Sequence, residues 1–470
     1  MEIGIVRIES VRLSHFRNVG FGEVFFSEKK KVEKGIIDDV SLSPLLGIYG
    51  QNGSGKTSAL LALRIIQFLL SGRELRPTIC DYIQTGFESF TIAIDFLVRR
   101  GDTYSYATYE IEIGRAKNRS VRVYSEKLSF TKFAEGERKA NLFSFTAPDK
   151  INPAFLKRMD AKNQAIYRYV CVHDTGNENE GMTAVYSSVF SKNLSALLEG
   201  NKEAFPDYYN LVVDLQTFAE SRLAIYSISY FNENDQVGIR LRLKEEKGDD
   251  PSRFICQDLF IPFAINQLPR AQFEVLKTNL DRINKVMPAI IPNYKVEIID
   301  VMVPDPRKMD PESSFINFVL ASNRGNGPVP LQYESNGIKK IISILSGFID
   351  AYNHEGCTMV VDELDSGIFE YLLGELVYAF GSFGMGQLIF TSHNMRVLEK
   401  LSHKHVFFST TDNNNAFTQI TNVHETNNLR DLYYRYIATG LKDGTKLFDM
   451  VNTEDIVAGL SSPEDGSFTE

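Results

Sequence analysis

A glycine-rich segment, residues 50–57, constrains the fold of this chain more than any other feature of its sequence. It reads GQNGSGKT and fits the pattern G-x-x-x-x-G-K-[ST]. The apolar residues 44–49 before it are typical of a short buried strand, and apolar residues after Lys56 recur at helical spacing until Gly72. Glycine lets the backbone wrap closely around an anion, and a helix N-terminus adds partial positive charge, so this order predicts a nucleotide phosphate loop.

In such a loop each residue has a place near the phosphates. We expect Lys56 to reach the β- and γ-phosphates and the Thr57 hydroxyl to ligate Mg²⁺. A chance glycine turn is the alternative, but the strand pattern before the segment and the helix pattern after it argue against this. The predicted nucleotide-binding residues are Gly50, Gln51, Asn52, Gly53, Ser54, Gly55, Lys56 and Thr57.

Two apolar strands in the second half of the chain are followed by polar residues. Residues 357–361 lead into Asp362 and Glu363. An aspartate at the end of a buried strand can hold Mg²⁺ through water, and the adjoining glutamate can polarise the attacking water. Residues 387–390 precede His393, which we expect beside the Asp362 strand and within reach of a γ-phosphate. For Asp362 and Glu363, the alternative is an acidic turn at the end of a strand. For His393, the alternative is a histidine that makes only local hydrogen bonds.

A serine and a glycine stand at the start of another predicted helix. Ser335 and Gly337 precede apolar residues that recur at helical spacing over residues 338–349. Taken alone, this is an ordinary capping motif. Its position before the Asp-Glu pair makes it a candidate anion site as well.

The order of these motifs resembles that of ABC-type ATPase heads: phosphate loop, long insert, Ser-x-Gly helix, Asp-Glu strand, aspartate loop and histidine strand. Residues 15–18, HFRN, and the long separation between the phosphate loop and Asp362 resemble the SMC, RecF and OLD branch. More narrowly, the chain resembles the standalone AAA-family ATPases of prokaryotic toxin–antitoxin, abortive-infection and other phage-defence systems. The segments that carry this likeness are YESNGIKKIISIL, VVDELDSGIFEYLLGEL and NNLRDLYYRY.

The resemblance covers residues 1–130 and 290–440, and it implies both a fold and a set of roles. The fold is an α/β ABC-type P-loop ATPase head with an antiparallel β subdomain, an inserted mainly helical lobe and no long coiled coil. The catalytic residues it implies are Lys56, Glu363 as the general base and His393 as the γ-phosphate sensor. Thr57 and Asp362 would be the metal ligands.

The resemblance also implies contacts with a second subunit. Ser335 and Gly337 would form the signature motif, which acts on the nucleotide of the partner, and Asp365 would lie at the dimer seam. Residues 334–337 read ESNG and so depart from the usual Leu-Ser-Gly-Gly signature. Gln84, after the first helix, is the candidate for the glutamine loop.

The pattern along the chain predicts four pieces. Residues 1–130 form the N-terminal part of the head, with alternating residues over 88–130 that predict antiparallel strands. Residues 131–290 form an inserted lobe, with helical periodicity at 194–218 and 272–286 but no sustained heptads. The C-terminal part of the head follows at 291–440, and residues 441–470 form an acidic tail.

Composition narrows the class of protein further. The chain has 470 residues and a formal net charge of −9, which argues against a generally basic nucleic-acid binder. The basic clusters at residues 29–31 and 115–122 still leave nucleic-acid binding open. The four cysteines (Cys80, Cys171, Cys256 and Cys357) have no zinc-site spacing and are typical of a reducing compartment. There is no apolar run of membrane-spanning length and no signal sequence, so we expect a cytoplasmic protein without a membrane partner.

The function expected from these features is Mg²⁺-dependent ATP hydrolysis that drives a dimerisation switch. The first hypothesis is a phage-defence or toxin–antitoxin ATPase, a homodimer or higher homo-oligomer, that controls a separately encoded effector, a nuclease or a toxin. The alternative is a DNA-binding repair ATPase similar to RecF or SMC. A small-molecule P-loop kinase is disfavoured, because it would not need Glu363, the Asp365 loop and His393 together. No carboxylate cluster of a nuclease follows His393.

Overall fold

The computed structural model describes most of the chain. The described residues are 3–26, 44–116, 121–132, 140–146, 150–151, 161, 164–165, 187–227, 232–233, 236–246, 254–301, 315–420, 428–441, 444–448 and 452–461. The basic cluster at 29–31, two residues of the 115–122 cluster (Lys117 and Arg119), Cys171 and the tip of the tail beyond residue 461 lie outside this part.

A buried six-stranded sheet carries the predicted nucleotide motifs at the ends of its strands. The strand order is β20 (Phe417–Thr418), β19 (Val406–Ser409), β3 (Leu45–Tyr49), β18 (Gln387–Thr391), β17 (Thr358–Val361) and β9 (Leu223–Tyr226). All neighbouring pairs are parallel except β19–β20. β3, β9, β17, β18 and β19 consist entirely of buried residues, as expected of a parallel sheet covered on both faces.

A seven-stranded antiparallel sheet forms a second layer. Its order is β2 (Val19–Phe25), β1 (Ile5–Phe16), β4 (Ser89–Arg100), β5 (Thr103–Arg115), β6 (Val121–Lys132), β7 (Ala140–Thr146) and β8 (Lys150–Ile151). The antiparallel strands predicted over 88–130 are β4, β5 and β6. Their alternation places one set of side chains in the core: Phe90, Ile92, Ile94 and Phe96 are at most 1% exposed.

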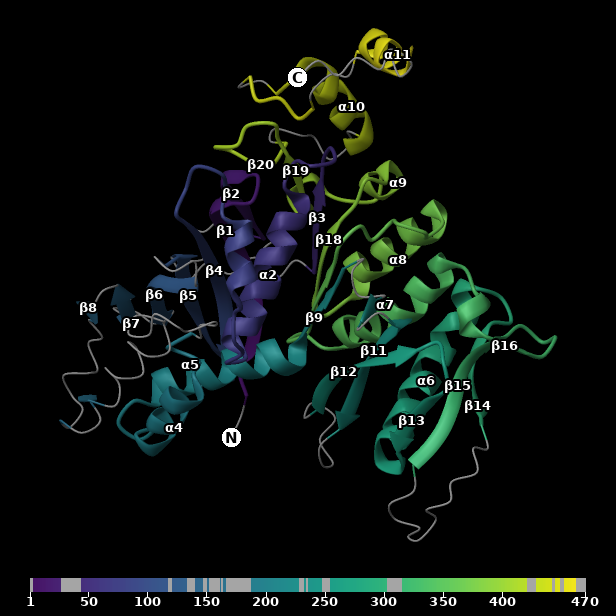
Figure 1. The fold of residues 1–470 in the computed structure, drawn as a ribbon, viewed down its shortest axis with the longest axis horizontal. Helices are drawn as coiled ribbons and strands as arrows, with labels where there is room; N and C mark the ends of the chain where they lie inside the picture. Colours follow the sequence, from purple (N-terminus) through teal and green to yellow (C-terminus); the bar gives the residue numbers. More distant parts are fainter. Residues whose placement is uncertain are drawn as a thin grey trace, which may run out of the picture.

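Helix α2 (Lys56–Leu70) packs between the two sheets (Figure 1). Its apolar residues share one core with the inner face of the antiparallel sheet and with Ile48, Val360 and Ile389 of the parallel sheet. The two sheets are also joined directly. The Gln387 side chain accepts a hydrogen bond from the Ile8 amide at 2.8 Å and donates to the Ile8 carbonyl at 2.9 Å. The phosphate-loop helix is thus fixed from both sides.

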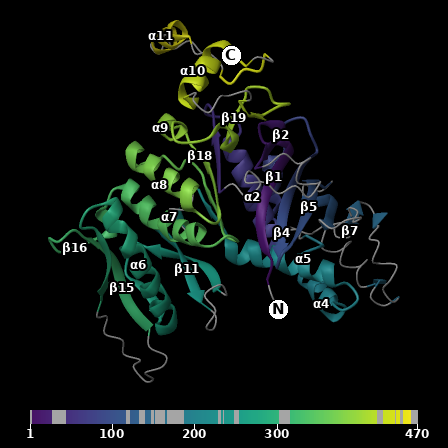
Figure 2. The ribbon, with the colours of Figure 1, turned by 180° about the vertical axis from the view of Figure 1, so that it is seen from behind.

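The other face of the parallel sheet is covered by α7 (Asn336–Asn353) and α8 (Glu370–Phe383), as the view from behind also shows (Figure 2). Short elements α9 (Met395–Leu398) and η6 (His403–His405) follow β18. The chain continues through α10 (Leu429–Thr439) and α11 (Thr453–Ser461), which lie at one end of the molecule (Figure 1). Within the predicted acidic tail, the structure therefore contains one helix.

The described part of the predicted insert contains strands as well as helices. The helices are α4 (Lys192–Gly200), α5 (Pro206–Thr217), the π-helical turn η3 (Phe218–Arg222) and α6 (Arg270–Ile290). The strands within residues 131–290 include β7 and β8 of the antiparallel sheet, β9, β10 (Asn232–Glu233), β11 (Gln236–Glu246), β12 (Phe254–Pro262) and β13 (Asn266–Pro269). The helical pattern predicted at 194–218 is two helices, because turns at residues 201–205 separate α4 from α5. The periodicity at 272–286 lies within α6.

The insert does not stand apart from the head. β9 is the edge strand of the parallel sheet, and α4 and α5 contribute Leu194, Leu198, Leu211 and Leu215 to the core around α2. The hairpin β11–β12 and α6 share the second core with α7. The boundaries at residues 130 and 290 stay a prediction.

A small sheet links the insert to the signature segment. It contains β13, β15 (Phe315–Asn323), β14 (Lys295–Asp300) and β16 (Pro328–Pro330), and the 3-10 turn η5 (Leu331–Tyr333) leads from it to α7. Another 3-10 turn, η1 (Pro77–Tyr82), follows α2.

The described helices are modest in length. The longest is α6, with 21 residues, so this part of the chain contains no long coiled coil. None of the described helices has the length and apolarity required to cross a bilayer.

Candidate nucleotide-binding site

The phosphate loop lies between β3 and α2, as the sequence predicts. Gly50, Gly53 and Gly55 have φ angles of +148°, +79° and +99°, values that favour glycine. A Cβ atom on Gly50 would lie 1.7 Å from Oγ of Ser409 on β19. No side chain caps the first turn of α2, which begins after Gly55. Its amide groups and the glycine backbone are therefore suited to an anion.

Lys56 is buried at the base of this loop, with an exposed fraction of 6%. Its ammonium donates hydrogen bonds to the Gly50 carbonyl at 2.8 Å and to the Gln51 carbonyl at 2.6 Å. Burial lowers the pKa of Lys56 to about 8, although Asp362, Glu363 and Asp365 act in the opposite direction. The side chain thus remains mostly charged at neutral pH and holds the loop around its own Nζ atom.

Thr57 and Asp362 meet at the end of β17. The Thr57 hydroxyl lies 3.4 Å from Oδ1 of Asp362, which also accepts a hydrogen bond from the Thr391 hydroxyl at 2.6 Å. A hydroxyl and a carboxylate oxygen are the hard ligands that Mg²⁺ prefers, and this ion keeps several waters and substrate phosphates as its other ligands. The Thr57 hydroxyl and the Asp362 carboxylate therefore fit Mg²⁺ held together with a nucleotide. Among the described residues there is no cluster of three or more His, Cys, Asp or Glu side chains suited to a metal.

Glu363 follows Asp362 in an unusual backbone conformation, with φ of +48°. The Glu363 amide donates to the Thr391 hydroxyl at 2.7 Å, and the next amide, that of Leu364, donates to the Thr391 carbonyl at 2.9 Å. A left-handed conformation in a residue with a long side chain persists only where its surroundings hold it. β18 therefore fixes where the Glu363 carboxylate can point.

His393 lies just after β18, the strand that pairs with β17, so the predicted neighbourhood is confirmed. Its backbone amide donates to Oδ2 of Asp365 at 3.1 Å. Burial, and then the positive charge of Lys56, lower the pKa of His393 below its ordinary value, while the three nearby carboxylates raise it. The ring is thus neutral at pH 7 and can donate one hydrogen bond.

These side chains open into one cavity of about 740 Å³, within the range of about 300–1,000 Å³ that small-ligand sites occupy. Its lining combines predicted and unpredicted residues: Arg17, Asn18, Asn52, Gly53, Gly55, Lys56, Thr57, Ser58, Gln84, Thr85, Glu363 and His393. Gln84, the candidate for the glutamine loop, is among them. Gly50, Gln51, Ser54 and Asp362 stand just behind this lining, in contact with Lys56, Ser409 or Thr57.

Residues outside the motif also support the phosphate loop, and none of them was predicted as a site residue. Asn18, in the turn between β1 and β2, donates to the Gly53 carbonyl and accepts a hydrogen bond from the Ser58 hydroxyl at 3.2 Å. The Ser409 hydroxyl bridges Ser54 and the Tyr49 carbonyl. The HFRN segment, noted only as a family likeness, was the available signal for Asn18 and for Arg17. No sequence pattern pointed to Ser409, because its contacts with Ser54 and Tyr49 are made between segments that lie far apart in the sequence.

The sequence of residues 10–279 matches the AAA domain family. The chain belongs to the AAA domain family. With the phosphate loop described above, this makes it an ATPase, and ATP binding follows from the family. No similar sequence is found among curated proteins.

Several solved ATPase heads resemble this AAA domain protein. The Smc head bound to the C-winged helix domain of ScpA is 12% identical with a TM-score of 0.39, over 88% of this chain and 97% of that chain. The Smc head domain with an extended coiled coil, bound to the C-terminal domain of ScpA and derived from Pyrococcus furiosus, is 11% identical with a TM-score of 0.39, over 92% and 99% of the two chains. The recombination mediator RecF with ATPrS is 12% identical with a TM-score of 0.33, over 89% and 100%.

The predicted signature residues of this AAA domain protein, Ser335 and Gly337, are not among the residues that line the cavity. Ser335 caps α7, and its hydroxyl accepts a hydrogen bond from the Ile338 amide at 3.4 Å. A Cβ atom on Gly337 would lie 1.9 Å from the Gly367 carbonyl oxygen, so the start of α7 packs directly on the loop that contains Asp365. The aromatic residues beside these two segments, Tyr333 and Phe369, are 74% and 72% exposed.

Lys340 lies within the helix predicted over residues 338–349, but no role was predicted for it. It lies one turn into α7 and is only 7% exposed. Its ammonium donates to the carbonyl oxygens of Glu363 and, at 3.0 Å, Ser366. Burial lowers its pKa to about 8, against the opposing effect of Asp365, Glu363 and Asp362. The only signal was a lysine directly before the apolar pair Ile341-Ile342, on the face of the helix that turns inward.

Proposed function

We propose that this chain is an ABC-type ATPase head that hydrolyses ATP with Mg²⁺ and uses hydrolysis to control its own dimerisation. The observation that carries this proposal is the convergence of a phosphate loop, the Thr57–Asp362 pair and two further polar groups, Glu363 and His393, at one cavity. Phosphoryl transfer relies mainly on positioning and on stabilisation of charge, and this set of residues supplies both.

Each residue then has a chemical role. Lys56 and the loop amides bind the phosphate oxygens and stabilise the charge that develops on them. Thr57 and Asp362 would hold Mg²⁺, which would neutralise phosphate charge. Glu363 accepts a proton from the attacking water. The neutral His393 ring donates a hydrogen bond toward the γ-phosphate.

A second copy of the chain is the expected partner at the mouth of the site. Ser335 and Gly337 stand outside the cavity of their own chain, and they pack on the Asp365 loop. The exposed Tyr333 and Phe369 flank this surface. Exposed aromatic side chains beside polar groups are common in interfaces, so we infer that this surface meets the phosphate loop of a partner.

Glu363→Gln tests the assignment of the base. The amide cannot accept a proton, so ATP turnover by the purified chain with Mg²⁺ should fall at least about a hundredfold, while ATP binding persists. Near-normal turnover in a folded variant would place the catalytic base elsewhere. Omission of Mg²⁺ from the wild-type assay should also stop turnover, since Thr57 and Asp362 then hold no ion.

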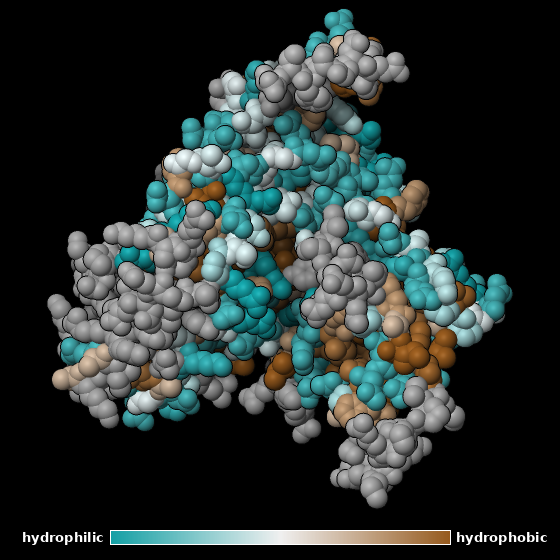
Figure 3. All heavy atoms as spheres, viewed as in Figure 1, coloured by the Kyte–Doolittle hydropathy of each residue, from teal (hydrophilic) through white to brown (hydrophobic). Residues whose placement is uncertain are grey.

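The output of the cycle is proposed to be a separately encoded effector, a nuclease or a toxin. The support is the likeness of three sequence segments to defence and toxin–antitoxin ATPases, together with exposed apolar residues on the insert and on the small sheet beside it. On the face shown in Figure 3, hydrophobic residues gather over α6 and the small sheet beside it. Exposed apolar residues of this region include Ile265, Phe315 and Val329. The test is to coexpress the neighbouring gene with wild type and, separately, with Glu363→Gln. The product of that gene should copurify with the chain, and its release should differ between wild type and Glu363→Gln.

A DNA-binding repair ATPase similar to RecF or SMC remains the second candidate. Arg115 ends β5 and Arg122 lies near the start of β6, so both are at the same end of the β5–β6 hairpin. Phosphate contacts are the main source of DNA affinity. Strong stimulation of ATP turnover by DNA, without a copurifying neighbour, would favour this candidate over the effector model.

A further inference from the structure

We propose that Lys340 is a positioning residue for Glu363, and that it ties the catalytic base to α7, the helix that the insert holds at its other end. This inference rests on the proposed ATPase function of Glu363. It concerns how the base is kept in place, because Lys340 does not line the cavity and donates to backbone carbonyls.

The first argument is the geometry of the loop that follows β17. The Lys340 ammonium donates to the carbonyls of Glu363 and Ser366, and the Ser366 amide donates to the Glu363 carbonyl at 2.9 Å. The Glu363 amide is held by Thr391 from the opposite side. The left-handed Glu363 is thus clamped at both its N–H and its C=O group. Loss of the Lys340 contact removes one of the two donors to the Glu363 carbonyl and the link from α7 to the Ser366 carbonyl.

The second argument is the cost of burying the lysine. An ammonium group that is removed from water loses hydration energy, and only a geometry that satisfies its donors offsets the loss. Lys339, the neighbouring lysine, is more exposed and donates instead to the Gln332 carbonyl at 2.8 Å. The two lysines thus serve different parts of the chain, and only Lys340 reaches the loop that carries the base.

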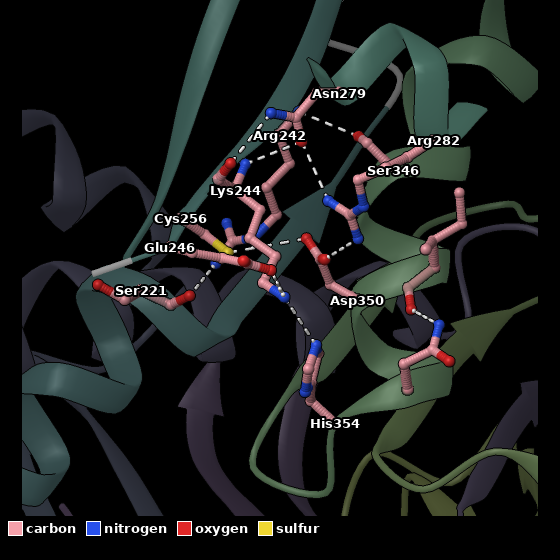
Figure 4. Close-up of polar contacts among 12 residues, drawn as sticks. Ser221, Arg242, Lys244, Glu246, Cys256, Asn279, Arg282, Ser346, Asp350 and His354 are labelled. Carbon is pink, nitrogen blue, oxygen red and sulfur yellow. Dashed lines mark hydrogen bonds and ion pairs between the residues drawn. The ribbon is translucent and has the colours of Figure 1, made fainter. Parts of the chain in front are cut away.

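The third argument is that residues of the insert form polar contacts with the second half of α7 (Figure 4). Arg282 of α6 forms an ion pair with Asp350 of α7, a residue that is 1% exposed. The Ser346 hydroxyl of α7 accepts a hydrogen bond from the Arg242 amide of β11 at 3.0 Å. Removal of one partner from a buried charge pair is costly, so these contacts keep α7 and the insert together.

The same network joins the insert elements to each other. Asn279 of α6 accepts a hydrogen bond from the Lys244 amide at 3.0 Å and donates to the Lys244 carbonyl at 3.1 Å. The Lys244 ammonium lies 3.2 Å from Nε2 of His354, directly after α7 (Figure 4). A displacement of α6 or of the β11–β12 hairpin is therefore transmitted to α7, and through Lys340 to Glu363.

Lys340→Met tests the inference, with Lys339→Met as the matched control. Because a small misplacement of a catalytic group is costly, we expect kcat of Lys340→Met to fall about 10- to 100-fold, with ATP affinity within about twofold of wild type. The kcat and the ATP affinity of Lys339→Met should both stay within about twofold of the wild-type values. The amide of Lys340→Gln can still donate to one carbonyl, so its kcat should lie between the values for Lys340→Met and wild type. If Lys340→Met does not fold, Lys340→Gln replaces it in the test.

Hydrogen exchange gives a readout that does not depend on turnover. Amides of residues 363–368 should exchange faster in Lys340→Met or Lys340→Gln than in wild type or Lys339→Met. Wild-type kcat and wild-type loop exchange in the folded Lys340 variants would overturn the proposal, as would an equal loss of kcat in Lys339→Met. If wild type itself does not hydrolyse ATP, the proposed function fails, whereas the exchange data still decide whether Lys340 anchors the loop.

Discussion

At the scale of single residues, the site depends on charged groups that are held by the backbone. Lys56 is bonded to carbonyls of its own loop, and Lys340 to carbonyls of the loop after β17. Each ammonium is buried near the carboxylates that follow β17, and burial lowers both pKa values to about 8. The two lysines thus place positive charge on opposite sides of the Asp362–Asp365 segment.

Lys56→Ala should abolish measurable ATP binding while the fold is kept. Hydrogen bonds to a charged group contribute about 1.5–3 kcal/mol each, and the lysine would make more than one to the phosphates. Its present contacts are with loop carbonyls, so the core loses little. Titration calorimetry with ATP, with circular dichroism as the check on folding, measures both effects. Tight ATP binding by a folded Lys56→Ala protein would contradict the phosphate-loop assignment.

At the scale of elements, the sequence predicted best what is local. The motif predicted the phosphate loop with β3 and α2, because these three elements are contiguous in the chain. The apolar pattern predicted β17 and β18, because each is a short apolar run bounded by polar residues. β9 was not predicted, since LAIY is only four residues long and its partner β17 lies far along the chain. Lys340 and Ser409 were missed for the same reason, because their contacts exist only once the sheet is assembled.

The interface of α7 with the insert should be sensitive to pH. Burial, and then the charge of Lys244, lower the pKa of His354 to about 4 in the folded chain, against about 6.5 when unfolded. The unfolded state therefore binds a proton first as the pH falls. Stability linked to neutral His354 is complete above pH 6.5 and is lost progressively toward pH 4.

Between pH 7 and pH 5, the free energy of unfolding of wild type should fall by about 1–2 kcal/mol more than that of His354→Gln. This figure allows for the partial exposure of the ring. Glutamine is a suitable control because it can still accept a hydrogen bond from Lys244 but does not titrate. Urea unfolding midpoints at the two pH values measure the difference. Equal losses in the two proteins would show that the lowered pKa of His354 does not contribute.

At the scale of the whole molecule, two cores meet at the parallel sheet. One contains α2 and the antiparallel sheet, and the other contains α7, α8 and the insert elements around α6. The phosphate loop belongs to the first and the signature segment to the second. The predicted signature residues Ser335 and Gly337 do not line the cavity, so in the proposed dimer a second copy is needed to bring them to a phosphate loop.

The central claim is that one site combines the phosphate loop of one chain with Ser335 of another. Mixing inactive Lys56→Ala chains with inactive Ser335→Arg chains measures this directly. In a mixed dimer, the Ser335→Arg chain supplies an intact loop and the Lys56→Ala chain an intact Ser335, so one complete site forms. ATP turnover should therefore return on mixing. No turnover, despite demonstrated exchange of subunits, would contradict the claim.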